Sequence, residues 1–158
     1  NAEMDWVVRL ISQVRGLRSE MNVPVKAEIP LLLKDAGDLA RTCIVTHADQ
    51  INRLARLSGI ELIDGDIPKG AVQDVLDEAT VVLPVADVID VAAEKARLEK
   101  EVGKQQSEID RFEKKLANEK FVANAPEEVV ATEREKLADA RQVQTRLNEA
   151  LERLGQVG

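Results

Sequence analysis

The chain has few of the residues that build a disulfide scaffold, an aromatic core or a histidine-based site. Aromatic residues make up only 2% of its 158 residues, so its core must consist mainly of Val, Leu, Ile and Ala. Cys43 is the only cysteine, which excludes an internal disulfide and favours a reducing, cytoplasmic location. His47 is the only histidine, and no cysteine pair or second histidine stands near it to complete a metal site or a triad.

Several other signals are missing from the chain. No apolar run approaches the ~18 residues of a membrane span and no secretory signal is present, so we expect no membrane partner. The chain opens at Asn1 without Met, and we expect it to be cut from a longer protein. Gly65 and Gly70 are not followed by the Lys-Ser or Lys-Thr of a phosphate-binding loop, and residues 64–66 lack the further ligands of a calcium loop. The sequence therefore predicts no catalytic residue and no metal site.

Charge is abundant and unevenly distributed. Charged residues form 32% of the chain, and the net charge is −7. Residues 1–91 carry nine Lys and Arg against fifteen Asp and Glu, whereas residues 92–158 carry thirteen against fourteen. The charges of residues 92–158 therefore nearly cancel, and this part of the chain has enough cations for a cluster on one face. The total charge neither supports nor excludes binding to nucleic acid, because clustered cations suffice for it.

Residues 1–57 show two helical patterns. Residues 4–22 place apolar side chains on one face, and Pro24 ends that helix. A second helix is expected from Asp38 to about Leu57, with a break near residues 47–49. Its inward residues are expected to be Leu39, Cys43, Ile44, Ile51, Leu54 and Ala55.

Strand patterns lie at residues 29–33, 59–63, 71–76 and 80–85. Pro30 cannot donate a hydrogen bond, which places the first strand at or near a sheet edge. The expected fold class is α+β: a small mixed α/β unit after a lone N-terminal helix, followed by a long antiparallel two-helix coiled-coil hairpin.

The hairpin is predicted from residues spaced alternately by four and three over several heptads, the pattern of a coiled-coil seam. The expected seam positions are Val91, Lys95, Leu98, Val102, Gln105, Ile109, Phe112 and Leu116, then Val130, Glu133, Leu137, Ala140, Gln144, Leu147, Leu151 and Leu154. Pro126 belongs in the first turn of the second helix, so the chain reverses just before it. Each helix of about thirty residues spans about 45 Å.

Equal distances from the turn define an expected register for the two helices. Phe112 and Leu116 should pack on Val130, Glu133 and Leu137. The polar residue Gln105 should lie near Gln144 and hydrogen-bond to it, as single polar residues do in other coiled-coil cores.

Ten of the thirteen cations of the hairpin admit two interpretations. They are Lys100, Lys104, Arg111, Lys114, Lys115 and Lys120, then Arg134, Arg141, Arg146 and Arg153. The first interpretation is an ordinary solvated surface with ion pairs between residues three or four apart. The second is an edge that follows the phosphates of a nucleic acid without reading its bases.

Three segments resemble bacterial valyl-tRNA synthetases. Residues 121–130 (FVANAPEEVV), followed by residues 133–136 (EREK), are similar to the turn of that family's coiled coil. Residues 14–24 (VRGLRSEMNVP) resemble the end of its anticodon-binding helical domain. Leu83-Pro84, together with Ala93-Glu94, Arg97-Leu98 and Lys100-Glu101, resembles the start of its coiled coil. These motifs occur in the family's order, and the resemblance covers essentially the whole chain.

The resemblance implies a C-terminal fragment of a class I aminoacyl-tRNA synthetase, which joins valine to its tRNA using ATP. It implies three parts: residues 1–24, the last helix of the anticodon-binding domain; residues 25–87, a small α+β connecting domain; and residues 88–158, a tRNA-binding arm. In that family the arm lies against the outer corner of tRNA, where the D and T loops meet. The family's His-Ile-Gly-His-like and Lys-Met-Ser-Lys-Ser-like signatures are absent from this sequence. The fragment is therefore expected to be non-catalytic and without a cofactor, with ATP bound by the catalytic domain of the full-length enzyme.

The expected partner is valine-specific tRNA rather than DNA, and the full-length enzyme is expected to be a monomer. The expected tRNA-binding residues are Lys104, Arg111, Lys114, Lys115, Lys120, Phe121, Val122, Arg134 and Arg141. The cations would contact phosphates, and Phe121 and Val122 would rest on an exposed base pair; folding of the turn explains these two residues equally well.

Two other functions remain open from the sequence. One is a coiled-coil protein–protein interaction or structural module without RNA binding. The other is a small-molecule domain centred on residues 26–86, for which the sequence offers no converging set of polar groups.

Overall fold

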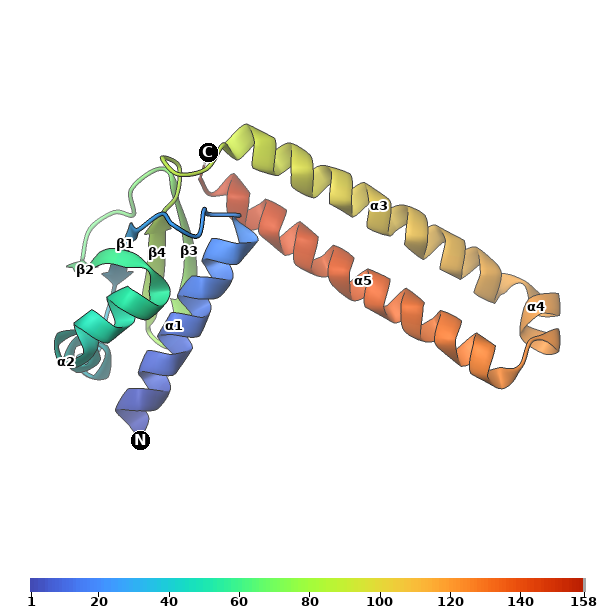
Figure 1. Cartoon of the computed structure of the whole chain (residues 1–158), viewed down its shortest axis with the longest axis horizontal. Helices are drawn as coiled ribbons and strands as arrows, with labels where there is room; N and C mark the ends of the chain where they lie inside the picture. The colour runs from blue at the N-terminus through green and yellow to red at the C-terminus, as the bar shows by residue number, and fades with distance from the viewer. Residues whose placement is uncertain (158) are drawn as a thin grey trace. The chain divides into compact units, whose positions relative to one another are not determined.

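The computed structural model describes residues 1–157, in which five helices and one four-stranded sheet are present (Figure 1). In chain order the elements are α1 (Ala2–Glu20), β1 (Ile29–Lys34), α2 (Asp38–Ala55), β2 (Leu57–Ile63), β3 (Ala71–Leu76), β4 (Ala79–Pro84), α3 (Val91–Ala117), α4 (Glu119–Asn124) and α5 (Glu127–Gly155). Two compact units result. The globular unit contains residues 1–94 and the chain from Arg153 onward, and the arm contains residues 95–152.

The first helix, α1, belongs to the core of the globular unit. The Asn1 side chain caps it by accepting a hydrogen bond from the Met4 amide at 2.9 Å. Trp6 and Leu10 are almost completely buried on its apolar face. The Cys43 thiol in α2 donates to the Glu3 carbonyl at 3.6 Å, and Gln13 donates to the carbonyl of Val75 in β3 at 3.0 Å. The helix is therefore held by both α2 and the sheet.

The sheet has the strand order β2-β1-β4-β3. β1 runs parallel to β2 and antiparallel to β4, and β3 and β4 form an antiparallel hairpin. Val81, Val82 and Leu83 in β4 are all fully buried, which is the pattern of a strand covered on both faces. The expected strand at residues 71–76 is confirmed with the same bounds.

The strand with Pro30 lies near a sheet edge, as expected, but not at it: β1 is next to the edge strand β2 and pairs on both sides. The register with β2 shifts between Ile29 and Pro30, and the pairing with β4 begins only at Leu32. Proline is tolerated at such an irregularity because no ladder bond requires its missing N–H group. The central part of the strand, with Leu31 and Leu33 fully buried, pairs normally.

The expected break in α2 is confirmed at His47, which has non-helical backbone angles (φ −118°, ψ 19°). Its inward face differs from the prediction at three positions. Leu39 and Leu54 are 38% and 42% exposed, Ala40 is buried without having been predicted, and Ala55 is buried as expected. One residue corresponds to about 100° of helix rotation, so a leucine one position before a buried alanine lies at the margin of the apolar face.

The predicted architecture of a lone N-terminal helix and a two-helix hairpin is wrong in both parts. The helix α1 shares the core of the globular unit, and a third helix, α4, stands at the turn between α3 and α5 (Figure 1). The Asn118 side chain caps α4 by accepting from the amides of Lys120 at 3.1 Å and Phe121 at 3.3 Å. Six residues are too few to show a heptad or helical period, so the pattern over residues 119–124 resembled a loop.

Candidate nucleic-acid interface

The arm is organised around a small apolar cluster in its seam. Ile109, Phe112, Leu137 and Ala140 are buried together, and Leu116 packs against them. This confirms the predicted approach of Phe112 and Leu116 to Leu137. Two positions differ from the prediction: the Lys95 side chain is 67% exposed and lies 4.0 Å from Glu99, and Ala150 is buried without having been predicted.

The polar contact of the seam has a different partner from the one predicted. Gln144 Nε2 donates to Gln106 Oε1 at 2.8 Å and to the Val102 carbonyl at 3.5 Å. The predicted hydrogen bond between Gln105 and Gln144 is therefore wrong by one residue. The Gln144 side chain extends past the centre of the seam to Gln106, on the side of α3. Gln105 instead lines a hollow beside Phe112 and Val143.

A buried carboxylate lies near the turn. Glu133 is only 7% exposed, and its Oε1 atom is 3.3 Å from Lys115 Nζ and 3.9 Å from Lys136 Nζ. Lys115 also lies over the Phe121 ring, 4.9 Å from its centroid. One predicted RNA-binding residue, Lys115, therefore has a structural role at the end of the arm.

A hollow of about 300 Å³ opens on this side of the arm. Its lining consists of Arg111, Phe112, Lys115, Glu133 and Lys136, which we call the basic groove. Arg111 lies over the Phe112 ring at 5.1 Å and pairs with Glu108 at 2.6 Å. Sequence reasoning missed Lys136, although its spacing of three from Glu133 on a helix places the two side chains close together.

The predicted RNA-binding residues do not share one face. Lys104, Arg111 and Lys115 are spaced by seven and four residues, so they follow one side of α3. Arg141 Nη2 instead binds Glu113 Oε1 at 2.7 Å. Glu113 is two residues from both Arg111 and Lys115, about 200° around the helix, so this pair lies on the opposite flank.

The predicted cations also differ in whether an acid neutralises them. Lys104 pairs with Glu101 at 3.3 Å, and Arg111, Lys115 and Arg141 have the partners given above. Across residues 1–157, five exposed cations of the arm have no acidic group within 4 Å: Lys100, Lys114, Lys120, Arg134 and Arg146. Three of these, Lys114, Lys120 and Arg134, belong to the residues nearest the turn, and we call them the tip cations. Phe121 and Val122, between them in sequence, are half-buried.

Other candidate chemistry is not supported by the described residues. Burial, followed by the nearby Glu3 carboxylate, raises the pKa of the Cys43 thiol, which keeps it protonated at neutral pH. Over residues 1–157 no group of three or more His, Cys, Asp or Glu side chains is placed to hold a metal ion. No helix within that range is both long enough and apolar enough to cross a membrane.

Comparison with known proteins links the arm to a function. A family model described as the valyl tRNA synthetase tRNA binding arm matches residues 90–155. A valine–tRNA ligase of Mesorhizobium japonicum is 49% identical over 157 residues, which are 99% of this chain and 17% of that protein. Valine–tRNA ligases of Agrobacterium fabrum and Caulobacter vibrioides are 46% and 43% identical, each over 99% of this chain and over 16% and 17% of their own lengths.

The chain thus spans about 17% of the length of these relatives, yet it matches them almost from end to end. The resemblance expected from the motifs at residues 14–24, 93–101 and 121–136 is confirmed. The chain belongs to the valyl-tRNA synthetase family, as the portion that includes the tRNA-binding arm.

Proposed function

We propose that this chain is the tRNA-binding portion of a valine–tRNA ligase. The arm contacts the outer corner of tRNA, where the D and T loops meet, while ATP binding and catalysis belong to other parts of the full-length enzyme. The observation that carries this proposal is the match of residues 90–155 to a tRNA-binding arm. A protein with these parts would act as a monomer in the cytoplasm on valine-specific tRNA.

The proposal assigns separate tasks to the domains predicted from the sequence. Residues 1–24 form the last helix of the anticodon-binding helical domain. Residues 25–87 connect this helix to the arm, and residues 88–158 form the arm and bind tRNA. The purified chain should show no valine-dependent pyrophosphate exchange, because the sequence lacks both signatures of the class I catalytic site. Exchange above background would contradict this division.

The tip cations are the strongest candidates for phosphate contacts. A tRNA corner offers phosphates, 2′-hydroxyls and the face of an outermost base pair rather than a groove that side chains can read. Lys114, Lys120 and Arg134 can bind phosphates without first releasing an acidic partner. Phe121 and Val122 stand beside them as the apolar surface on which a base rests.

The basic groove is the second contact surface. Arg111, Lys115 and Lys136 surround Phe112 there, and Lys104 continues the same side of α3. Exposed ion pairs contribute only about 0–1 kcal/mol, so the Arg111–Glu108 and Lys104–Glu101 pairs can be exchanged for phosphates. Arg141 lies on the other flank and is the predicted residue least suited to join this surface.

The test compares two matched double variants in tRNA titrations at several salt concentrations. K120Q/R134Q removes two unpaired cations near the turn, and K100Q/R146Q removes one Lys and one Arg that are equally unpaired but far from it. The first variant should bind tRNA about tenfold more weakly at low salt, with a salt slope smaller by about 1.5, because two fewer counterions are released. The second should bind like the unmodified chain.

A third variant, R111Q/K136Q, measures the contribution of the basic groove in the same titration. Helical circular dichroism must remain unchanged in every variant. Equal losses in K120Q/R134Q and K100Q/R146Q would show that the arm attracts RNA only through its overall charge. Unchanged affinity in both K120Q/R134Q and R111Q/K136Q would contradict the proposed surfaces.

The alternative of a protein-interaction module gains no support from the arm surface. Among the described residues of the arm, the large apolar side chains that are exposed are Val129 and Val143, at 40% and 39%. Single exposed valines are ordinary on soluble proteins and do not form a docking patch. A chain that binds no tRNA but self-associates would revive this alternative.

A further inference from the structure

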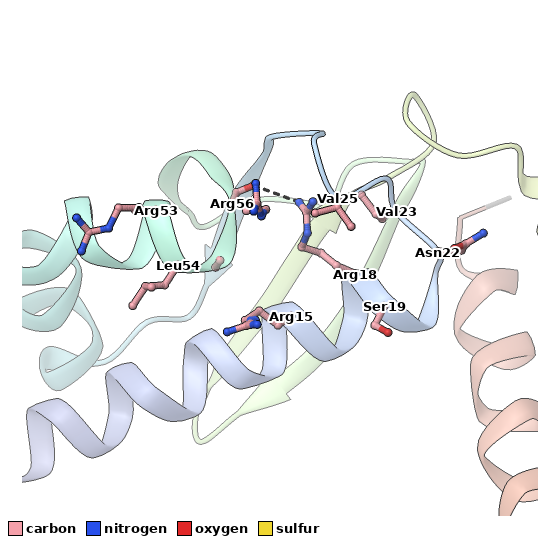
Figure 2. A pocket seen from close by; sticks show the side chains of 10 residues that line it. Arg15, Arg18, Ser19, Asn22, Val23, Val25, Arg53, Leu54 and Arg56 are labelled. Carbon is pink, nitrogen blue, oxygen red and sulfur yellow. Dashed lines mark hydrogen bonds between the residues drawn. The ribbon is translucent and has the colours of Figure 1, made fainter.

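A pocket of about 490 Å³ lies in the globular unit, between the C-terminal half of α1 and the C-terminal end of α2 (Figure 2). Four arginines line it: Arg15, Arg18, Arg53 and Arg56. The pocket is outside residues 90–155, to which the tRNA-binding arm is matched. Its residues come from two separate segments of the sequence, 15–25 and 53–56, which only the fold brings together.

Arg18 is a buried residue that connects the segments lining this pocket. It is 6% exposed, and its guanidinium donates to the carbonyls of Arg56 at 3.1 Å, Pro24 at 3.1 Å and Ala27 at 2.7 Å (Figure 2 shows the bond to Arg56). These bonds hold the end of α2 and the loop after α1 in place. Burial, and next the positive charge of Arg56, lower the pKa of Arg18.

The other three arginines are exposed and without acidic partners. Within residues 1–157, Arg15, Arg53 and Arg56 have no carboxylate within 4 Å. This is unexpected because residues 1–91 carry nine Lys and Arg against fifteen Asp and Glu, and Arg9 among them pairs with Asp77. Cations gathered without acids raise the local positive potential, which favours a bound anion.

The pocket also has apolar surface. Val25 is 68% exposed and Leu54 is 42% exposed, and both line it. Guanidinium groups bind phosphate through paired hydrogen bonds and also stack on flat rings. A volume of this size is in the range of small-ligand sites. Charge for a phosphate and apolar surface for a base are thus present together.

We propose that this pocket binds a nucleotide unit, with its phosphate held by Arg15, Arg53 and Arg56 and its base resting against Val25 and Leu54. The nucleotide belongs either to an RNA strand or to a free ligand, since the recognised chemistry is the same. The proposal does not depend on the function of the arm.

The test is a titration of the full 158-residue chain followed by backbone amide NMR. The probes are AMP, a five-nucleotide adenosine RNA, adenosine and inorganic phosphate. Binding should shift the signals of residues 15–25 and 53–56. AMP binding identifies a free nucleotide as a ligand, and binding of the RNA alone identifies a nucleotide within a strand. Adenosine should bind much more weakly than AMP, and phosphate alone should also bind more weakly.

Two double variants locate the site. R15Q/R53Q should weaken binding at the pocket at least about tenfold, because each lost guanidinium removes charge-assisted hydrogen bonds. K34Q/K69Q removes the same charge from elsewhere in the globular unit and should bind normally. Arg18 and Arg56 are kept, since Arg18 connects the segments lining the pocket and Arg56 has the left-handed backbone of the α2 C-cap (φ 54°).

Several results would overturn the proposal. They are shifts confined to the arm, equal binding by R15Q/R53Q and the unmodified chain, or inorganic phosphate binding as tightly as AMP and the RNA. K120Q/R134Q tests independence from the arm. If that variant loses tRNA affinity but retains AMP or RNA shifts at the pocket, the pocket is a separate site. If both signals disappear in it, the pocket proposal fails while the arm proposal stands.

Discussion

Lys115 Nζ lies 3.3 Å from Glu133 Oε1, and this pair joins the two long helices near their turn. The Glu133 side chain is 10% exposed and that of Lys115 is 44% exposed. The carboxylate is therefore removed from water, while the ammonium group remains hydrated. Loss of the lysine leaves the more deeply buried partner with only the longer contact to Lys136 at 3.9 Å.

We predict that K115M lowers the free energy of unfolding by about 1 kcal/mol, the modest value expected for a half-exposed partner. E133L should be neutral or stabilising, because leucine suits the buried position, and K115M/E133L should recover the loss. Urea unfolding of the three variants measures this. A destabilisation in E133L as large as that in K115M would show that the pair stabilises the arm by attraction.

The apolar cluster gives a second prediction. Leu137 is 9% exposed among Ile109, Phe112 and Ala140, so L137A should lower the free energy of unfolding by about 2–3 kcal/mol through lost burial and a cavity. V143A removes methyl groups from the same helix at a position that is 39% exposed, and it should cost less than about 0.5 kcal/mol. Similar losses in both variants would disprove the assigned seam.

Arg18 gives a third prediction, within the globular unit. R18M removes three hydrogen bonds to carbonyl groups, although the Pro24 carbonyl keeps a second donor, the Ala27 amide, and it should cost about 3 kcal/mol in unfolding free energy. R18K should recover only part of the lost stability, because a single ammonium group cannot donate in the several directions of the planar guanidinium group. Thermal unfolding distinguishes the variants. Equal stability of R18K and the unmodified chain would show that charge, rather than geometry, is required.

The Arg9–Asp77 pair predicts a dependence on pH. Both of its nitrogen–oxygen contacts are 3.0 Å, and the hydrogen bonds from Arg9 lower the pKa of the Asp77 carboxyl below its ordinary 3.8. The folded state therefore holds this proton less tightly than the unfolded state. The stabilisation is present above pH 3.8 and is lost as the pH falls through the lowered value.

D77N is the suitable variant because Asn also tolerates the left-handed backbone at this turn (φ 54°). The stability difference between the unmodified chain and D77N should be positive at neutral pH, vanish in acid and shrink in high salt, since the pair is exposed. A difference independent of pH would assign the effect to the turn rather than to the ion pair.

The local sequence determined which segments are helical or extended and which motifs link the chain to its family. The heptad spacing identified the seam residues Phe112 and Leu137, and residues 71–76 were recognised as a strand with correct bounds. The break at His47 was also predicted. Each of these depends on residues close together in the chain, where periodicity and turn chemistry operate.

The tertiary structure decided how these segments meet. It placed Pro30 in a strand that pairs on both sides, gave Gln144 the partner Gln106, and put Arg141 on the flank opposite Arg111. It also gathered four arginines around one pocket from two separate segments. A period shows which face of a helix is apolar. The neighbour of each side chain depends on packing, and therefore on residues far away in the sequence.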